Sequence, residues 1–142
     1  MSDFGKLLTA VITPFDNNGV LNTDTLWRLC KKLVHEKSDG LVLSGTTGES
    51  PNLTKEDRKI IYSTAKDSVG DKAKIIAWTG TYSTKESIEY TKMANDIGVD
   101  GIMIVTPYYS KPSQFGILKH FEEVSNNTCL LYTSPSPRDV LR

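Results

Sequence analysis

The stretch GLVLSGTTGES, residues 40–50, joins a short apolar run to a loop rich in glycine and hydroxyl side chains. The run at 40–44 has the length of a β-strand and is apolar at nearly every position, which is typical of a strand covered on both faces in a parallel sheet. Similar runs occur at three other places: LLTAVIT (7–13), KIIAW (74–78) and GIMIV (101–105). The sequence therefore predicts four buried parallel strands.

Amphipathic helices are predicted between these strands. After the first strand, five apolar side chains have the i, i+3, i+4, i+7, i+8 spacing of one helical face: Leu26, Leu29, Cys30, Leu33 and Val34. After the fourth strand, a similar face that runs to about Asn126 is formed by Ile117, Leu118, Phe121 and Val124. The two middle helices are expected to begin at capping boxes, Thr54-x-x-Asp57 and Ser83-x-x-Glu86. They are expected to end at Gly70 and Gly98.

A βα unit repeated four times leaves two main folds, an open doubly wound sheet or a closed barrel. The loop after the first strand, TPFDNNGVLNTDT (13–25), contains no G-x-G-x-x-G, so the dinucleotide-binding fold lacks its best signal. A barrel has eight units and about 250 residues, and four units in residues 1–128 make half of one. We therefore expect an α/β chain, the first four βα units of a truncated (β/α)₈ barrel. Half a barrel would expose its first and fourth strands as edges.

The composition excludes several classes of protein. The chain has 142 residues, of which 38% are hydrophobic and 24% charged, as is typical of one soluble globular domain. Lys plus Arg and Asp plus Glu are 17 each, so no net charge points to nucleic acid. The apolar runs are too short to span a membrane, and MSDFGKLL at the start lacks the features of a signal peptide. We expect a cytoplasmic protein, with Cys30 in the core, and no metal site, because His35 and His120 lie on helices without partner motifs.

The loop SGTTGES, residues 44–50, is the first candidate for chemistry. Its two glycines let the backbone turn tightly, and its hydroxyl and N–H groups are donors for a small anion. In a barrel, this loop would lie at the C-terminal end of a strand, where active sites are found. The spacing alone leaves a simple turn without a ligand equally open. A phosphate-binding P-loop is not indicated, since no G-K-[ST] follows.

The second candidate is TPYYSKPS, residues 106–113, after the fourth predicted strand. Two adjacent tyrosines held between prolines could direct one phenol inward as a proton shuttle. Taken alone, the stretch is more typical of ordinary packing with the hydroxyl groups at the surface.

Together, these stretches carry a resemblance to a known family. SGTTGES and VTPYYSKPSQFG (105–116), with AVITPF (10–15), closely resemble the dihydrodipicolinate synthase family. This family belongs to the Schiff-base aldolases related to N-acetylneuraminate lyase. The resemblance covers roughly residues 5–128 in unbroken order.

The resemblance implies a (β/α)₈ barrel that condenses pyruvate with L-aspartate-4-semialdehyde, at the entry to diaminopimelate and lysine synthesis. A barrel lysine would form the imine with pyruvate, without a cofactor, and the parent enzyme would be a homotetramer. Thr47 would hold the pyruvate carboxylate, and Thr46 would belong to a Tyr–Thr–Tyr proton relay. Tyr109 would be the relay member that enters the neighbouring subunit's site.

A regulatory lysine site is also implied, formed by Ser50, Glu86 and Tyr108. Some positions depart from the family pattern and put lysine inhibition in doubt: Tyr82 replaces a common Asn, and Lys55 and Arg58 replace the histidines of some members. Trp78 replaces a small residue at the end of the third predicted strand.

The βα pattern stops after residue 128, where CLLYTSPSPRDVLR begins. Its first eleven residues resemble the translation of a transposon-based sequencing adaptor, so we expect residues 129–142 to be a non-native tail. The relay's second tyrosine, the substrate-binding arginine and the Schiff-base lysine would then lie outside this chain, which alone would be inactive. Two alternatives stay open: another pyruvate-dependent aldolase of the superfamily (a keto-deoxy-sugar-acid aldolase or sialic-acid lyase), or a non-enzymatic half-barrel binding module.

Overall fold

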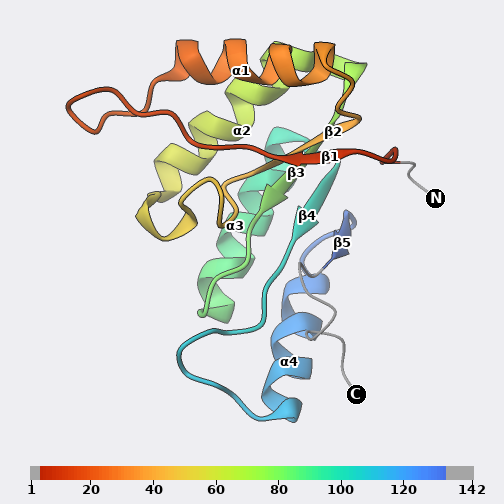
Figure 1. The fold of residues 1–142 in the computed structure, drawn as a ribbon. Helices are drawn as coiled ribbons and strands as arrows, with labels where there is room; N and C mark the ends of the chain where they lie inside the picture. Colours follow the sequence, from red (N-terminus) through yellow and green to blue (C-terminus); the bar gives the residue numbers. More distant parts are fainter. Residues whose placement is uncertain (1–3, 134–142) are drawn as a thin grey trace. The chain divides into compact units, whose positions relative to one another are not determined.

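The computed structural model describes residues 4–133 (Figure 1). They form two compact units, with the division between Trp78 and Thr79. In the described part of the chain, every helix is too short or too polar to cross a bilayer.

The first unit contains three parallel strands, β1 (Leu8–Ala10), β2 (Gly40–Leu43) and β3 (Lys74–Trp78). β2 lies between the other two and is buried at every position. β3 matches its predicted limits and is buried from its second residue onward. β1 is not covered on both faces as expected, because Leu8 is 41% exposed.

Two helices accompany these strands, α1 (Thr23–His35) and α2 (Lys55–Val69), and they pack against each other. Short 3₁₀ turns precede and follow α2, at Ser50–Asn52 and Gly70–Lys72. The predicted capping box is confirmed, because Thr54 and Asp57 each bond the other's backbone N–H. Cys30 is a core residue of α1, as predicted, and its burial raises the pKa of the thiol to about 11.

The second unit contains α3 (Thr84–Ile97), β4 (Gly101–Met103), α4 (Gln114–Ser125) and β5 (Leu131–Thr133). Gly98 ends α3 in the left-handed conformation, as predicted. Only half of the predicted capping box forms at its start: Ser83 accepts a hydrogen bond from the Glu86 N–H, but the Ser83 N–H donates to the Thr81 hydroxyl and not to Glu86. α3 packs against α4. The buried His120 of α4 bonds Thr84 through its Nδ1, 2.9 Å from the threonine Oγ1.

Within each unit, strands that follow one another in the chain are neighbours. β2 pairs with β1 and with β3 in the first unit, and β4 pairs with β5 in the second. In the flavodoxin-like doubly wound order, β1 would lie between β2 and β3 instead. Consecutive strands that are neighbours are the arrangement of a (β/α)₈ barrel.

Two predicted strands are shorter than expected. β1 ends at Ala10 instead of residue 13. Val11 makes one more bond to the Val42 carbonyl, and the Thr13 hydroxyl then bonds the Gly48 carbonyl in the loop after β2. Pro14 has no N–H to continue the ladder. β4 ends at Met103, and the Met103 carbonyl accepts the bonds from Thr79 and Gly80.

A short fifth strand forms where the βα pattern was expected to have stopped. Leu131–Thr133 pairs in parallel with Gly101–Met103, so β4 is not the free edge that four strands alone would leave. Three residues in an extended conformation can add to a parallel ladder whatever their origin. The strand therefore does not test the origin of residues 129–142, and the non-native tail stays a prediction. Residues 134–142 of that tail lie outside the described residues.

Gly80→Ala is expected to lower the free energy of unfolding by about 1–3 kcal/mol, the usual cost of overpacking. A Cβ on Gly80 would lie 3.0 Å from the Cα and carbonyl carbon of Ile104, which are backbone atoms and cannot turn aside. Urea denaturation of the longer protein that we expect to contain this chain measures the loss. Gly19→Ala is the control, since a Cβ there meets nothing within 4 Å and only its left-handed φ of 77° is strained. A smaller loss at Gly80 than at Gly19 would contradict the steric explanation.

Candidate functional site

The loop after β2, residues 44–50, has an unusual backbone. Ser44 and Glu49 adopt φ angles of 58° and 59°, in the left-handed region. Residues other than glycine seldom adopt this conformation, and such strain is concentrated at functional sites. The Ser44 hydroxyl is also buried without a hydrogen-bond partner among the described residues.

The two glycines of this loop are needed for close packing. A Cβ on Gly48 would lie 3.0 Å from the Val11 carbonyl oxygen and 3.1 Å from the backbone nitrogen of Ser44. A Cβ on Gly45 would lie 3.1 Å from Cε3 of the Trp78 ring. The loop therefore rests on the backbone that follows β1 and on the last side chain of β3.

Hydrogen bonds fix the loop from within and from the segment that follows β1. The Glu49 N–H donates to the Thr46 carbonyl and the Ser50 N–H to the Gly45 carbonyl, both at 3.1 Å. The Thr13 hydroxyl donates to the Gly48 carbonyl at 2.7 Å. Thr13 belongs to the AVITPF stretch, but its contact with Gly48 has no local signal because the residues are 35 positions apart.

Thr46 and Thr47 lie at the exposed tip of this fixed loop. No hydrogen-bond partner for either hydroxyl occurs among residues 4–133. A loop held by these bonds, with two exposed threonines at the C-terminal end of a parallel strand, is suited to binding a small anionic group.

Arg58 holds the other end of the loop and was missed by the sequence analysis. Its side chain is 2% exposed. Nη2 donates to both the carbonyl and the hydroxyl of Ser50 at 2.8 Å, and Nη1 donates to the Trp78 carbonyl at 3.0 Å. The Tyr62 hydroxyl donates to the same Trp78 carbonyl at 2.7 Å. A signal existed, because Arg58 is in phase with the buried Ile61 and Tyr62 on one face of α2.

The second candidate stretch lies in the second unit. Tyr108 packs edge to face against Tyr82, with the ring centroids 5.5 Å apart and the planes at 81°. Tyr108 is 44% exposed, and its carbonyl accepts a hydrogen bond from the Ser110 N–H at 2.8 Å. Glu86 lies in the first turn of α3 with a half-buried side chain.

Tyr109 combines backbone strain with exposure. Its φ is 69°, again left-handed, and its side chain is 97% exposed. Its phenol therefore does not point into its own unit as an inward proton shuttle would. A bulky residue with positive φ is a true outlier, and an exposed one at the end of a β-strand's loop is a candidate for contact with something outside the unit.

The structure brings the predicted residues together in two groups. Thr46, Thr47 and Ser50 share one loop of the first unit, while Tyr108 and Tyr109 share one loop of the second. Ser50 has its hydroxyl engaged by Arg58. Across residues 4–133, no group of three His, Cys, Asp or Glu side chains is placed to hold a metal ion.

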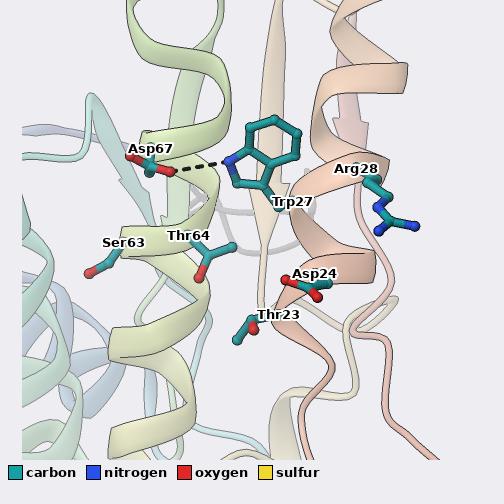
Figure 2. Close-up of a pocket in the computed structure, with 7 residues that line it drawn as sticks. All are labelled: Thr23, Asp24, Trp27, Arg28, Ser63, Thr64 and Asp67. Atoms are coloured by element: carbon teal, nitrogen blue, oxygen red, sulfur yellow. Dashed lines mark hydrogen bonds between the residues drawn. The ribbon is translucent and has the colours of Figure 1, made fainter.

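A cavity of about 650 Å³ lies elsewhere, between α1 and α2 (Figure 2). Trp27 donates from its ring nitrogen to Asp67 across it at 3.1 Å, and the ammonium of Lys31 lies 4.2 Å from the centre of the Trp27 ring. No predicted site residue lines this cavity, whose lining is Thr23, Asp24, Trp27, Arg28, Ser63, Thr64 and Asp67. It belongs to the helical layer and not to the strand ends where barrel active sites lie.

Known proteins resemble this chain over nearly all of its length. The sequence profile of the Dihydrodipicolinate synthetase family matches residues 3–140. A 4-hydroxy-tetrahydrodipicolinate synthase from Desulforudis audaxviator is 50% identical over 141 residues, which are 97% of this chain and 48% of that protein. One from Moorella thermoacetica is 48% identical over 136 residues, 94% of this chain and 47% of that protein. The chain thus spans about half the length of the curated relatives it matches.

Solved structures of the same family also resemble this chain. A dihydrodipicolinate synthase from Bacillus anthracis superimposes with a TM-score of 0.91 at 40% identity, over 94% of this chain and 46% of that one. One from Acinetobacter baumannii, in complex with pyruvate, gives a TM-score of 0.90 at 31% identity, over 93% of this chain and 45% of that one. The predicted fold, the N-terminal part of a (β/α)₈ barrel, is confirmed. By sequence and by structure, this chain belongs to the dihydrodipicolinate synthetase family.

Proposed function

We propose that this chain is the N-terminal part of a cytoplasmic 4-hydroxy-tetrahydrodipicolinate synthase, which condenses pyruvate with L-aspartate-4-semialdehyde in diaminopimelate and lysine synthesis. The observation that carries the proposal is the loop at 44–50, which is fixed by Thr13 and Arg58 and presents Thr46 and Thr47 outward. The names of the relatives and the pyruvate complex of one of them support the choice of substrate.

Each threonine has a distinct role in this proposal. Thr47 holds the pyruvate carboxylate through its hydroxyl and N–H, since a preorganised set of donors stabilises an anion without reorganising. Thr46 passes protons within a relay, because forming and resolving an imine needs timed proton transfer. Both roles require a loop whose backbone does not move, and the contacts of Gly45 and Gly48 support that requirement.

Tyr109 is proposed as the relay member that enters the active site of a neighbouring subunit. Its strained backbone holds an almost fully exposed phenol away from its own unit, as a side chain that completes a neighbour's site would need. The proposed assembly is a homotetramer built as a dimer of dimers, with this tyrosine at the tight dimer interface. Ser50, Glu86 and Tyr108 remain a proposed regulatory lysine site, and a relative from Cyanidioschyzon merolae has been solved with lysine bound.

The imine-forming lysine is proposed to lie outside this chain. Within residues 4–133, every lysine is exposed except the half-buried Lys74. Lys74 opens β3 at the end opposite to the loops that follow the strands. A lysine that must lose its proton to attack a carbonyl needs a desolvated position, which none of these lysines has.

Reductive trapping tests this proposal. We expect borohydride with pyruvate to leave the mass of the 142-residue chain unchanged. The full-length protein, treated in the same way, should gain one reduced pyruvyl group on a single lysine beyond residue 128. Release of product from pyruvate and L-aspartate-4-semialdehyde then separates the synthase from sugar-acid aldolases, which trap pyruvate equally well. A stable adduct on any lysine of the present chain would contradict the assignment.

A further inference from the structure

We propose that Arg58 is a positioning residue that fixes the threonine-bearing loop by joining its end to the end of β3. The proposal rests on the function proposed above, because it concerns how Thr46 and Thr47 are held for pyruvate. Arg58 lies on α2 and acts through Ser50 and Trp78, without reaching either threonine.

The contacts of Arg58 form a clamp across two elements. One guanidinium nitrogen donates to the carbonyl and the hydroxyl of Ser50, the residue that closes the loop. The other donates to the carbonyl of Trp78, the last residue of β3. The planar guanidinium reaches acceptors on two segments from two separate nitrogens in a fixed geometry, whereas a lysine offers all its donors from one nitrogen at the end of a flexible chain.

The clamp acts on both ends of the loop. Ser50 is tied back to Gly45 by its N–H, so Arg58 restrains the residue just before Thr46 through one further hydrogen bond. The Trp78 ring covers Gly45 so closely that a Cβ there would lie 3.1 Å from it. When Arg58 orients the Trp78 carbonyl, it therefore also supports the surface on which the loop rests.

Tyr62 supplies a matched control. Its hydroxyl donates to the same Trp78 carbonyl at 2.7 Å from the same buried face of α2, whereas the bonds to Ser50 come from Arg58. Tyr62→Phe removes one buried bond to β3 and leaves the bonds to Ser50 intact. A purely structural role of Arg58 predicts similar consequences for both variants, and the clamp predicts different ones.

The test uses the full-length protein with Arg58→Met, Tyr62→Phe and Ser50→Ala. We expect Arg58→Met to raise the KM for pyruvate roughly 10- to 100-fold, the scale of a reacting group displaced by about 1 Å. Tyr62→Phe should leave this KM within about threefold of the wild type, the effect of a lost contact that does not reach the loop. Ser50→Ala, which removes one of the acceptors, should raise the KM in the same direction by less, and it keeps the test available if Arg58→Met does not fold.

Amide hydrogen exchange gives a readout that does not need activity. Arg58→Met should speed exchange in the peptide that contains residues 44–50, while Tyr62→Phe should not. If the wild type traps no pyruvate, the proposed function fails, and the exchange data still test the clamp. Unchanged exchange in the loop of Arg58→Met, or the same change in Tyr62→Phe, would overturn the clamp. So would an unchanged pyruvate KM in both Arg58→Met and Ser50→Ala of an active enzyme.

Discussion

Thr46→Val and Tyr109→Phe are each expected to lower the kcat of the full-length protein by about 10²- to 10⁴-fold, the usual contribution of a positioned acid–base group. Each substitution removes one hydroxyl from the proposed proton relay and nearly preserves the volume of the side chain. Neither hydroxyl makes a hydrogen bond to another described residue, so the fold should not depend on it. Initial rates at saturating pyruvate and L-aspartate-4-semialdehyde measure the effect.

Two controls make this prediction specific. Thr47→Val removes the neighbouring hydroxyl in the same loop, and it should raise the KM for pyruvate because the carboxylate loses a donor. Mixing the two inactive variants should restore part of the activity if Tyr109 completes a partner's site, because a mixed dimer has one site with both hydroxyls. Near-normal kcat in both Thr46→Val and Tyr109→Phe would refute the relay.

The elements of this fold could be predicted because their signals are local. The capping box at Thr54 and Asp57 and the glycine ends of α2 and α3 depend on residues within one helical turn, and the structure has them as predicted. The length of β1 could not be read in this way. Its apolar run continues past Ala10, but Thr13 bonds the carbonyl of Gly48, which lies 35 positions along the chain and cannot be read from the local pattern.

The motifs of the candidate site could be recognised in the sequence, but the residue that holds its loop, Arg58, could not. The residues of SGTTGES are adjacent, so they can be recognised together as a candidate anion-binding loop, although their spacing alone fits a simple turn equally well. The helical phase of Arg58 could indicate that it is buried, but not what it binds, because its partners Ser50 and Trp78 lie 8 and 20 positions away. The left-handed backbone of Tyr109 could not be predicted either. A proline restricts the residue directly before it, and neither proline of this stretch directly follows Tyr109.

The 142-residue chain is expected to self-associate when it is expressed alone. β1 pairs with β2 on one side, and no strand pairs with its other side among the described residues. Leu7, Leu8 and Ile12 are 51%, 41% and 56% exposed along this edge. Leaving an unpaired backbone group buried costs about 1–3 kcal/mol, and keeping the apolar side chains in water forgoes about 25 cal/mol per Å² of burial. Pairing with a second copy relieves both costs, as exposed edge strands commonly do.

A charge placed on β1 should separate association through this edge from nonspecific association through exposed apolar side chains. We expect Leu8→Lys to shift the chain toward smaller species in sedimentation velocity at micromolar concentration, because a lysine on an edge strand opposes strand pairing. Ile60→Lys is the matched control, since Ile60 is 42% exposed, against 41% for Leu8, but lies on α2. It adds the same charge without touching the edge, so it should leave the association unchanged. If both variants dissociate equally, net charge and not the β1 edge governs the association. A sharp monomer of the unaltered chain with a cooperative melt would mean that β1 needs no further partner, because the first unit would then be stable with its edge in water.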